Sequence, residues 1–342
     1  ELMPLRNLTH LEFLNCSFTD VNSLEALKYS TKLEELIINN TNIRDLAPVV
    51  NFSALEKIHL NNTAVDSLHA ISDLISLQDI EFASTPVFSL DGLSNLTGLQ
   101  RLDFSDTKID DLSPLSGLRN IYFLKFEHTA IENLQPLKDI SGLHFLFADQ
   151  TNVSDLSPLN DLPELSKIYC DKSGVNRTEA IRFMEHNPNV LVVFESADLV
   201  NWWDKLTPAW RDVFTRSASL IKNPSKEELH QIIKITTINI AGKKQIQTLD
   251  PLSNLSQLKV INCQGTGIDN LNALGALSDL TELNFSNTGV EDIGPLEKLS
   301  KLHHLSFDRT SVSSFVPLMQ LEELQYVYCD NTPVPDDEIV EF

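Results

Sequence analysis

The sequence predicts an α/β solenoid, in which short similar turns stack so that their strands form one parallel sheet. Three observations predict it: apolar residues that recur every 22 positions, a two-residue alternation inside each repeat, and a second half that often contains proline. One repeat cannot bury its apolar stripe alone, so the repeats must stack on one another. The strands are then expected to lie about 4.8 Å apart.

The first array has a leucine-type residue at every 22nd position. We number the other positions of each repeat from this residue, so that plus three is the third residue after it. Apolar residues return at plus three and plus five, which is the period of a strand, and a threonine stands at plus eight in seven repeats, with Ser173 in the eighth. Valine or isoleucine at plus ten, leucine at plus thirteen and frequent proline at plus fifteen indicate a turn and a short helical return. The leucine-type residues are Leu11, Leu33, Leu55, Leu77, Leu99, Ile121, Leu143 and Leu165. A helix and a last strand are expected within 184–194, so the first array covers residues 1–195.

A second array covers residues 235–342. Leu258, Leu280, Leu302 and Leu324 are again 22 residues apart, and 235–252 forms a first repeat with one extra residue. Residues 2–16 align without gaps to 249–263, and 169–183 resemble 328–342, so the arrays are predicted to be copies of one unit. The second copy stops within its last helix. We therefore expect a fragment of a longer protein, with a Trp-rich segment before residue 1 and a further strand after residue 342.

Between the arrays, residues 196–234 predict three short helices and contain all three tryptophans. Thr207 followed by Pro208 is a favourable helix start, and Ser225 with Glu228 fits a capping box. The end of a solenoid is a bare apolar layer that needs a cap. This Trp-rich segment is therefore expected to be a cap and linker ahead of the second array.

These patterns resemble the leucine-rich-repeat family, in the 22-residue form of bacterial internalins and a phosphatase regulatory subunit. The clearest repeat is LQRLDFSDTKIDDLSPLSGL, residues 99–118. The resemblance implies a right-handed solenoid with its parallel sheet on the concave face and short helical or 3-10 returns on the convex face. The family usually has asparagine where this chain has threonine, and that asparagine ties neighbouring turns together. Because a threonine hydroxyl both donates and accepts, we expect it to form a shorter ladder of the same kind.

The composition argues against several kinds of partner. A net charge of −22 disfavours nucleic acid and anionic lipid as partners. No apolar run reaches the ~18–20 residues needed to span a membrane. The cysteines share the plus-five position and lie too many repeats apart for disulfides; they are Cys16, Cys170, Cys263 and Cys329. Zinc-type spacings and phosphate-binding glycine loops are absent from the sequence, so we predict no catalytic residue, no cofactor and no metal. Localisation stays open between the cytoplasm and a bacterial cell surface.

The resemblance implies that partners bind at plus two and plus four, on the concave face. Toward the end of the first array these positions are aromatic, and exposed rings would mark an interaction patch. The alternative is that the helices of 196–234 fold back over the rings. In the middle, Lys57, Asp79 and Arg101 alternate in sign and are expected to form a lateral ion-pair ladder. The candidate partner-binding residues are Tyr122, Phe123, Phe145, Phe147 and Tyr169.

The predicted function is a non-catalytic protein–protein interaction scaffold, whose partner the sequence does not name. Two alternatives stay open at this point. One is a bacterial cell-surface adhesin or a carbohydrate-binding module, which the aromatic patch would also serve. The other is a domain that recruits or regulates a catalytic region outside these residues.

Overall fold

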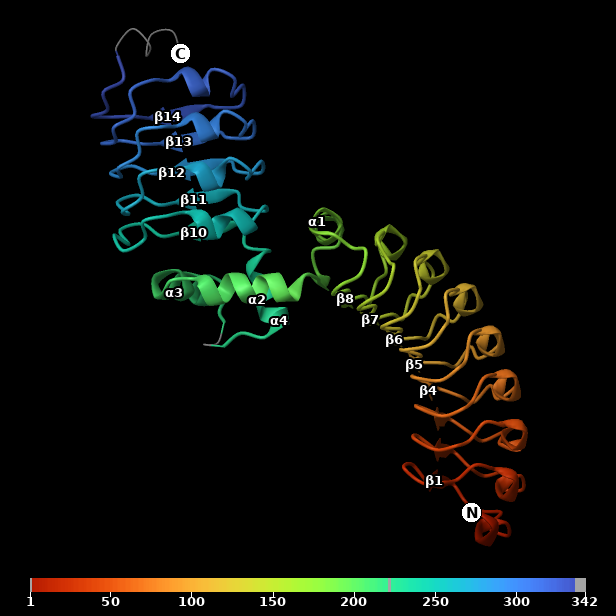
Figure 1. Ribbon diagram of the computed structural model, residues 1–342. Coiled ribbons are helices and arrows are strands. Elements are labelled where there is room, and N and C mark those ends of the chain that lie inside the picture. Colours follow the sequence, from red (N-terminus) through yellow and green to blue (C-terminus); the bar gives the residue numbers. More distant parts are fainter. Residues whose placement is uncertain (1, 221–222, 336–342) are drawn as a thin grey trace. The chain divides into compact units, whose positions relative to one another are not determined.

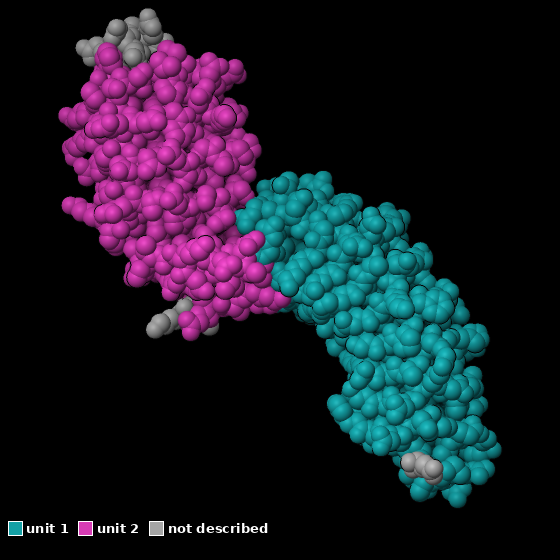
Figure 2. Space-filling model, in the orientation of Figure 1, with its two compact units in different colours: residues 1–195 teal, residues 196–342 magenta. Residues whose placement is uncertain are grey.

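The computed structural model describes residues 2–220 and 223–335, which form two compact units, residues 1–195 and 196–342 (Figures 1 and 2). Each unit is built on one parallel sheet, with nine strands in the first and five in the second. Strands that are consecutive in the chain are neighbours in the sheet, as a solenoid requires. Residues 336–342, where the helix of the second copy was expected, lie outside the described residues.

The strands of both units are three residues long and, except for the last strand of the first unit, begin at plus two of each repeat. Their register keeps the 22-residue period, so that Leu36 lies opposite Ile58 and Ile58 opposite Ile80. In the second unit Ile238 lies opposite Ile261, which places the extra residue of the first repeat outside the strands. The strands of the first unit are β1 (Phe13–Asn15), β2 (Glu35–Ile37), β3 (Lys57–His59), β4 (Asp79–Glu81), β5 (Arg101–Asp103), β6 (Phe123–Lys125), β7 (Phe145–Phe147), β8 (Lys167–Tyr169) and β9 (Leu191–Val193). Those of the second are β10 (Thr237–Asn239), β11 (Val260–Asn262), β12 (Glu282–Asn284), β13 (His304–Ser306) and β14 (Tyr326–Tyr328).

Short 3-10 helices return the chain from each strand to the next. Proline occupies the first turn of several of them, where its fixed φ fits and its missing N–H is not needed. In the first unit the strands line the inner side of the curve and the 3-10 helices its outer side (Figure 1). These helices are η1 (Met3–Leu5), η2 (Glu25–Leu27), η3 (Ala47–Asn51), η4 (His69–Ile71), η5 (Asp91–Leu93), η6 (Ser113–Leu115), η7 (Gln135–Leu137), η8 (Ser157–Leu159), η9 (Asp250–Asn254), η10 (Asn272–Leu274), η11 (Gly294–Leu296) and η12 (Val316–Leu318).

The interior of each array is a set of columns, in which the same position of successive repeats stacks. The plus-five column of the first unit contains Phe82, Phe104 and Phe126, all fully buried. Their rings stack with centroids 6.0 Å and 5.7 Å apart. The first unit then ends with helix α1 (Arg177–His186), whose N-terminal backbone is capped by the side chain of Asn176, followed by β9.

The threonines at plus eight close their own turns. Each hydroxyl donates to the carbonyl at plus five of the same repeat, as from Thr63 to Leu60 and from Thr107 to Phe104, both at 2.8 Å. The expected threonine ladder between neighbouring turns is therefore wrong. The hydroxyl is carried directly on Cβ, so it reaches only its own turn.

Neighbouring turns are instead tied together at plus six and plus seven. The N–H of Asn40 donates to the carbonyl of Asn61, and that of Asn62 to Ala83, both at 2.8 Å. A side chain at plus six adds a second bond, from the Asn61 N–H to Asn39 Oδ1 at 2.8 Å. To make these bonds the plus-seven residues adopt the left-handed conformation, with φ of 56° at Asn40 and 54° at Asn62. The inter-repeat ladder thus runs mainly through the backbone.

Replacing Thr107 with valine is expected to lower the free energy of unfolding by about 1–3 kcal/mol, because the Phe104 carbonyl loses a buried donor. Urea titration followed by circular dichroism measures the change. The matched control is Thr97→Val, since Thr97 is exposed and surface substitutions change stability by less than about 0.5 kcal/mol. Equal effects at the two positions would contradict a structural role for the plus-eight hydroxyl.

Three helices precede the second array, at the positions predicted for the cap. They are α2 (Ser196–Lys205), α3 (Pro208–Ser217), whose N-cap is Thr207, and α4 (Lys226–Ile232), which begins with the capping box of Ser225 and Glu228. Trp210 of α3 is 1% exposed, stacks on Phe214, and donates from Nε1 to the carbonyl of Thr248 at 3.2 Å. Helix α3 is thereby fixed to the first repeat of the second array. Among the described residues, no helix has the length and apolar character to span a bilayer.

The four cysteines are free thiols that differ in burial. Burial raises the pKa of Cys263 to about 12 and also raises the pKa of Cys170. Cys16 and Cys329, near the outer ends of their arrays, are only partly buried. A thiol must ionise to react, so at pH 8 a pKa of about 12 leaves on the order of one Cys263 in ten thousand as thiolate.

We therefore expect a disulfide reagent such as DTNB to modify Cys16 and Cys329 in the folded protein well before Cys170 and Cys263. Peptide mass spectrometry of the partly modified protein gives the order. In 8 M urea all four should react at similar rates, which serves as the control. Early modification of Cys170 or Cys263 under native conditions would show that the plus-five column is open to solvent.

Candidate functional site

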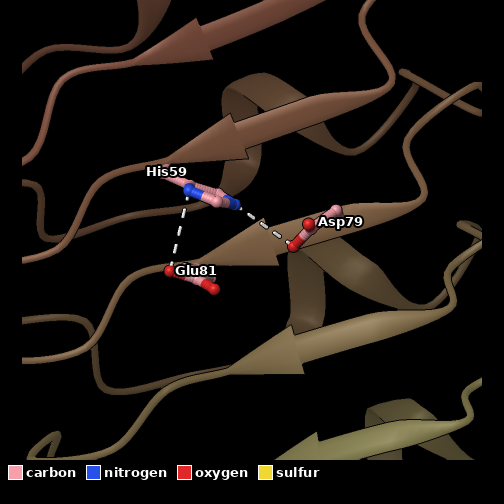
Figure 3. A group of neighbouring side chains, drawn as sticks. All are labelled: His59, Asp79 and Glu81. Carbon is pink, nitrogen blue, oxygen red and sulfur yellow. Dashed lines mark hydrogen bonds and ion pairs between the residues drawn. The ribbon is translucent and has the colours of Figure 1, made fainter.

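A network of ionisable side chains occupies the middle of the concave face of the first unit. His59 on β3 faces Asp79 and Glu81 on β4 (Figure 3). Its Nε2 lies 3.2 Å from Asp79 Oδ1, and its Nδ1 lies 3.6 Å from Glu81 Oε2. Arg101 on β5 reaches the same carboxylates, with Nη2 3.1 Å from Glu81 Oε1 and Nε 3.8 Å from Asp79 Oδ1. The two acids are thus held between an imidazole and a guanidinium.

The predicted lateral ladder is only partly present. Arg101 does approach Asp79, but Lys57 pairs with Glu35 at 3.8 Å, and His59 takes the second place beside Asp79. His59 stands at plus four and Asp79 at plus two, so their contact is diagonal. Long side chains on neighbouring strands can reach such diagonal partners. Comparing the same position in successive repeats therefore does not predict the contact of His59 with Asp79, because the two residues stand at different positions of their repeats.

His59, Asp79 and Glu81 also present ligand atoms within 4.8 Å of one another, and imidazole with carboxylate is a donor set that several metals accept. Glu81, however, already accepts hydrogen bonds from Asn61 Nδ2 at 2.9 Å and from Arg101 Nε at 3.2 Å. A cation would have to compete with a guanidinium that faces both carboxylates. We therefore interpret this cluster as an ion-pair and hydrogen-bond network in which Arg101 faces both carboxylates, and assign no metal to it.

An aromatic row continues the concave face from the network. It consists of Phe123, Phe147 and Tyr169, which we call the concave aromatic row. The rings of Phe123 and Phe147 are 5.0 Å apart, and those of Phe147 and Tyr169 stack at 4.5 Å with an interplanar angle of 3°. All three side chains are partly exposed. These contacting rings on an open sheet form an apolar surface, with Phe123 tilted against the stacked pair.

Arg101 joins the ion-pair network to the aromatic row. Its guanidinium carbon lies 3.7 Å from the centre of the Phe123 ring, which is a cation–π contact. The same guanidinium is held by Glu81. Next to it, burial lowers the pKa of Lys125, but the carboxylates of Asp103 and Glu127 outweigh burial, so that the pKa is raised overall. Lys125 therefore stays charged at neutral pH, and Glu81 holds the Arg101 guanidinium in place.

The predicted partner-binding residues are only partly brought together. Phe123, Phe147 and Tyr169 form the row, whereas the Phe145 ring lies 6.2 Å from that of His144. Tyr122 precedes β6 and is 41% exposed, and among the described residues no ring contact joins it to the row. Strand alternation separates Tyr122, which stands at plus one, from the row. Phe145 shares plus two with Phe123 and therefore lies on the same face as the row, but its ring packs beside His144.

The concave face of the second unit is more polar and carries a smaller aromatic group. His304 on β13 stacks on Tyr326 of β14, with ring centroids 4.5 Å apart. Tyr326 and Tyr328 are 49% and 55% exposed. The second unit therefore shares the position of the aromatic residues, near the end of its array, but not their extent.

Comparisons with known proteins support the fold. No protein-family model and no curated protein matches the chain. Among solved structures, internalin C2 of Listeria monocytogenes is 27% identical over 54% of this chain and 80% of its own, with a TM-score of 0.51. The internalin inlF of the same species is 20% identical over 97% of this chain and 84% of its own, with a TM-score of 0.49. A plant peptide hormone receptor, RGFR1, solved in complex with RGF2, is 14% identical over 96% of this chain and 61% of its own, with a TM-score of 0.52.

The stacked parallel strands and the 22-residue register define a leucine-rich-repeat solenoid. Proteins of this fold class are generally binding scaffolds and not enzymes. The repeat is of the internalin-like form, as the sequence predicted. The compared structures give no support to carbohydrate as a partner.

Proposed function

We propose that this chain is a non-catalytic scaffold that holds a protein partner on the concave face of its first unit. The concave aromatic row is the main contact, and the observation that carries the proposal is its geometry. Three partly exposed rings in mutual contact, two of them stacked and the third tilted, lie beside an arginine that is already oriented by Glu81. Aromatic and arginine side chains dominate binding energy in protein interfaces, and side chains held in place before binding lose less entropy when the partner arrives.

The neighbouring ion-pair network would orient the partner on the concave aromatic row. Its charges are largely paired within the chain, and paired charges contribute more to specificity and to the rate of association than to affinity. An apolar segment of the partner would therefore lie on the rings, while polar groups of the partner align with Arg101 and Lys125. The carboxylates of the network serve to orient these cations and have no catalytic part in the proposal.

The proposal is tested with the double variant Phe123→Ala/Phe147→Ala of the full chain. Proteins captured by immobilised wild-type chain are compared with those captured by the variant, and each candidate is then titrated by calorimetry. We expect the partner to bind the variant at least about tenfold more weakly, which is the usual loss at a central aromatic contact. The matched control is Phe13→Ala, which removes a 53% exposed phenylalanine from plus two of β1 on the same sheet.

Two outcomes would contradict the proposal. One is a partner that binds the double variant as tightly as the wild type. The other is protection of Phe147 from hydroxyl radicals in the free chain to the level of the buried Phe104, which would mean that the row is covered, for example by the helices of 196–234. Binding to a glycan array that is lost on Phe147→Ala would replace the protein partner with a carbohydrate.

A further inference from the structure

Two apolar side chains on the 3-10 helix side of the first unit break the repeat pattern. Val50 is 55% exposed, and the other repeats of this array have Lys28, Ser72, Ser94, Ser116, Lys138 and Asn160 at its position. Phe88 is 68% exposed, and its counterparts are Asn22, Arg44, Asp66, Asp110, Glu132 and Ser154. The other repeats of the array show which residues the fold accepts at these two positions. Polar residues satisfy the fold at both positions, so the fold itself does not require these two apolar side chains.

Both side chains line grooves on the two sides of η4. One groove, of about 450 Å³, includes Val50, and the other, also of about 450 Å³, includes Phe88. The grooves share Asp66, Ser67, His69 and Ser72. They are therefore adjacent grooves with η4 as their common wall, and together they form a surface across three repeats, which we call the depression, on the side of the unit away from the strands.

The depression is rimmed by acidic groups. Asp45, Asp66 and Asp73 line the first groove and Asp91 the second. Arg44 is the one lysine or arginine among the residues that line the two grooves, and it is paired with Asp66 at 2.9 Å. The surface thus combines apolar side chains with unbalanced negative charge. Its complement is a segment that carries both apolar and basic side chains.

We propose that this depression binds an extended protein segment in which apolar side chains lie next to lysine or arginine. Val50 and Phe88 belong to repeats two steps apart, so they are separated by roughly 10 Å or more, the length of about three residues of extended chain. Two apolar side chains of the segment would contact Val50 and Phe88, and basic side chains between them would face Asp66, Asp73 and Asp91. This surface is separate from the concave aromatic row, and the proposal does not depend on the function proposed above.

The test uses a phage-displayed library of random 12-residue peptides. The library is selected on the full wild-type chain, with counter-selection on the double variant V50K/F88D. Both substitutions introduce residues that other repeats carry at the same positions, as Lys28 and Asp66 show, so the fold should tolerate them. We expect enrichment of peptides with apolar and basic residues, and an affinity that falls at least about tenfold on V50K/F88D.

Two further variants make the test specific. Ile75→Thr removes a 69% exposed apolar side chain that lies outside both grooves, and it should leave the affinity within about twofold of the wild type. The variant D73N/D91N should weaken binding at low salt and have less effect at high salt, because salt screens exposed charges. It also provides the test if melting curves show that V50K/F88D is unfolded.

The proposal is overturned if no peptide is enriched, if the enriched peptides bind V50K/F88D and D73N/D91N as tightly as the wild type, or if they lack basic residues. Peptides whose binding is lost on Phe147→Ala but kept on V50K/F88D belong to the concave face and also count against it.

Discussion

Replacing Phe104 with alanine is expected to lower the free energy of unfolding of the first unit by about 3–5 kcal/mol. The ring is fully buried between Phe82 and Phe126, and its removal leaves a cavity in the plus-five column. Because each repeat is stabilised mainly by its neighbours, the loss weakens the stacking on both sides of the fifth repeat. Urea titration followed by circular dichroism measures the change.

The matched control for this prediction is Phe88→Ala, which removes the same ring from an exposed position. Its effect on stability should stay within about 0.5 kcal/mol. Leucine at residue 104, the type found at plus five of another repeat as Leu60, should recover part of the loss. Similar stabilities for Phe104→Ala and Phe88→Ala would contradict the assignment of the plus-five column to the interior.

Replacing Trp210 with alanine is expected to destabilise the second unit by about 3–5 kcal/mol. The substitution removes a ring that is 1% exposed and also removes the donor to the Thr248 carbonyl. Hydrogen exchange should show the effect first at the start of the array, for example at the Ile240 N–H, which donates to the Asn262 carbonyl. Amides of the first unit, such as that of Phe104, should keep their protection.

Trp210→Phe separates the two contributions of this side chain. It keeps an aromatic ring that can stack on Phe214 but loses the hydrogen bond to Thr248. We expect an intermediate loss of about 1–3 kcal/mol. If Trp210→Ala leaves the exchange of Ile240 unchanged, helix α3 does not stabilise the array that follows it.

The repeat sequence predicts the strands and the buried columns because both depend on local periodicity. A residue at plus three shares its face of the strand with the residue at plus five, so Leu36, Ile58 and Ile80 could be assigned to equivalent inward positions of adjacent strands from spacing alone. The cap helices were predictable for a similar reason, since Thr207 and Ser225 carry their capping signals within a few residues.

The hydrogen bonds of the turns were less predictable. The left-handed column at plus seven contains Phe18, Asn40, Ser84 and His128, which share no side-chain property. Their conformation follows from backbone bonds to the next repeat, which no single residue reveals. The plus-eight threonine has the chemistry for either role, and only the three-dimensional turn shows that the hydroxyl faces its own repeat.

The sequence predicts which face of the sheet carries the candidate site, but it does not predict which side chains contact one another there. Positions plus two and plus four placed Phe123, Phe147 and Tyr169 on the concave surface. Phe147 lies directly opposite Tyr169 in the sheet, but the contacts of Phe123 with Phe147 and of His59 with Asp79 are diagonal, and diagonal contacts depend on side-chain length and strand stagger. The grooves beside Val50 and Phe88 could not be predicted from the repeat pattern, because they lie on the face where repeats are usually polar.

The internal closure of each turn by its threonine has a consequence for how such chains change length. A segment of 22 residues carries the donor and the acceptor of that bond together, so a whole segment can be gained or lost without leaving either group stranded. One such segment inserted between Arg101 and Phe123 would separate the guanidinium from the ring by a further strand spacing, about 4.8 Å. The distance between the charged and the aromatic halves of the concave surface is therefore adjustable in discrete steps of one strand spacing.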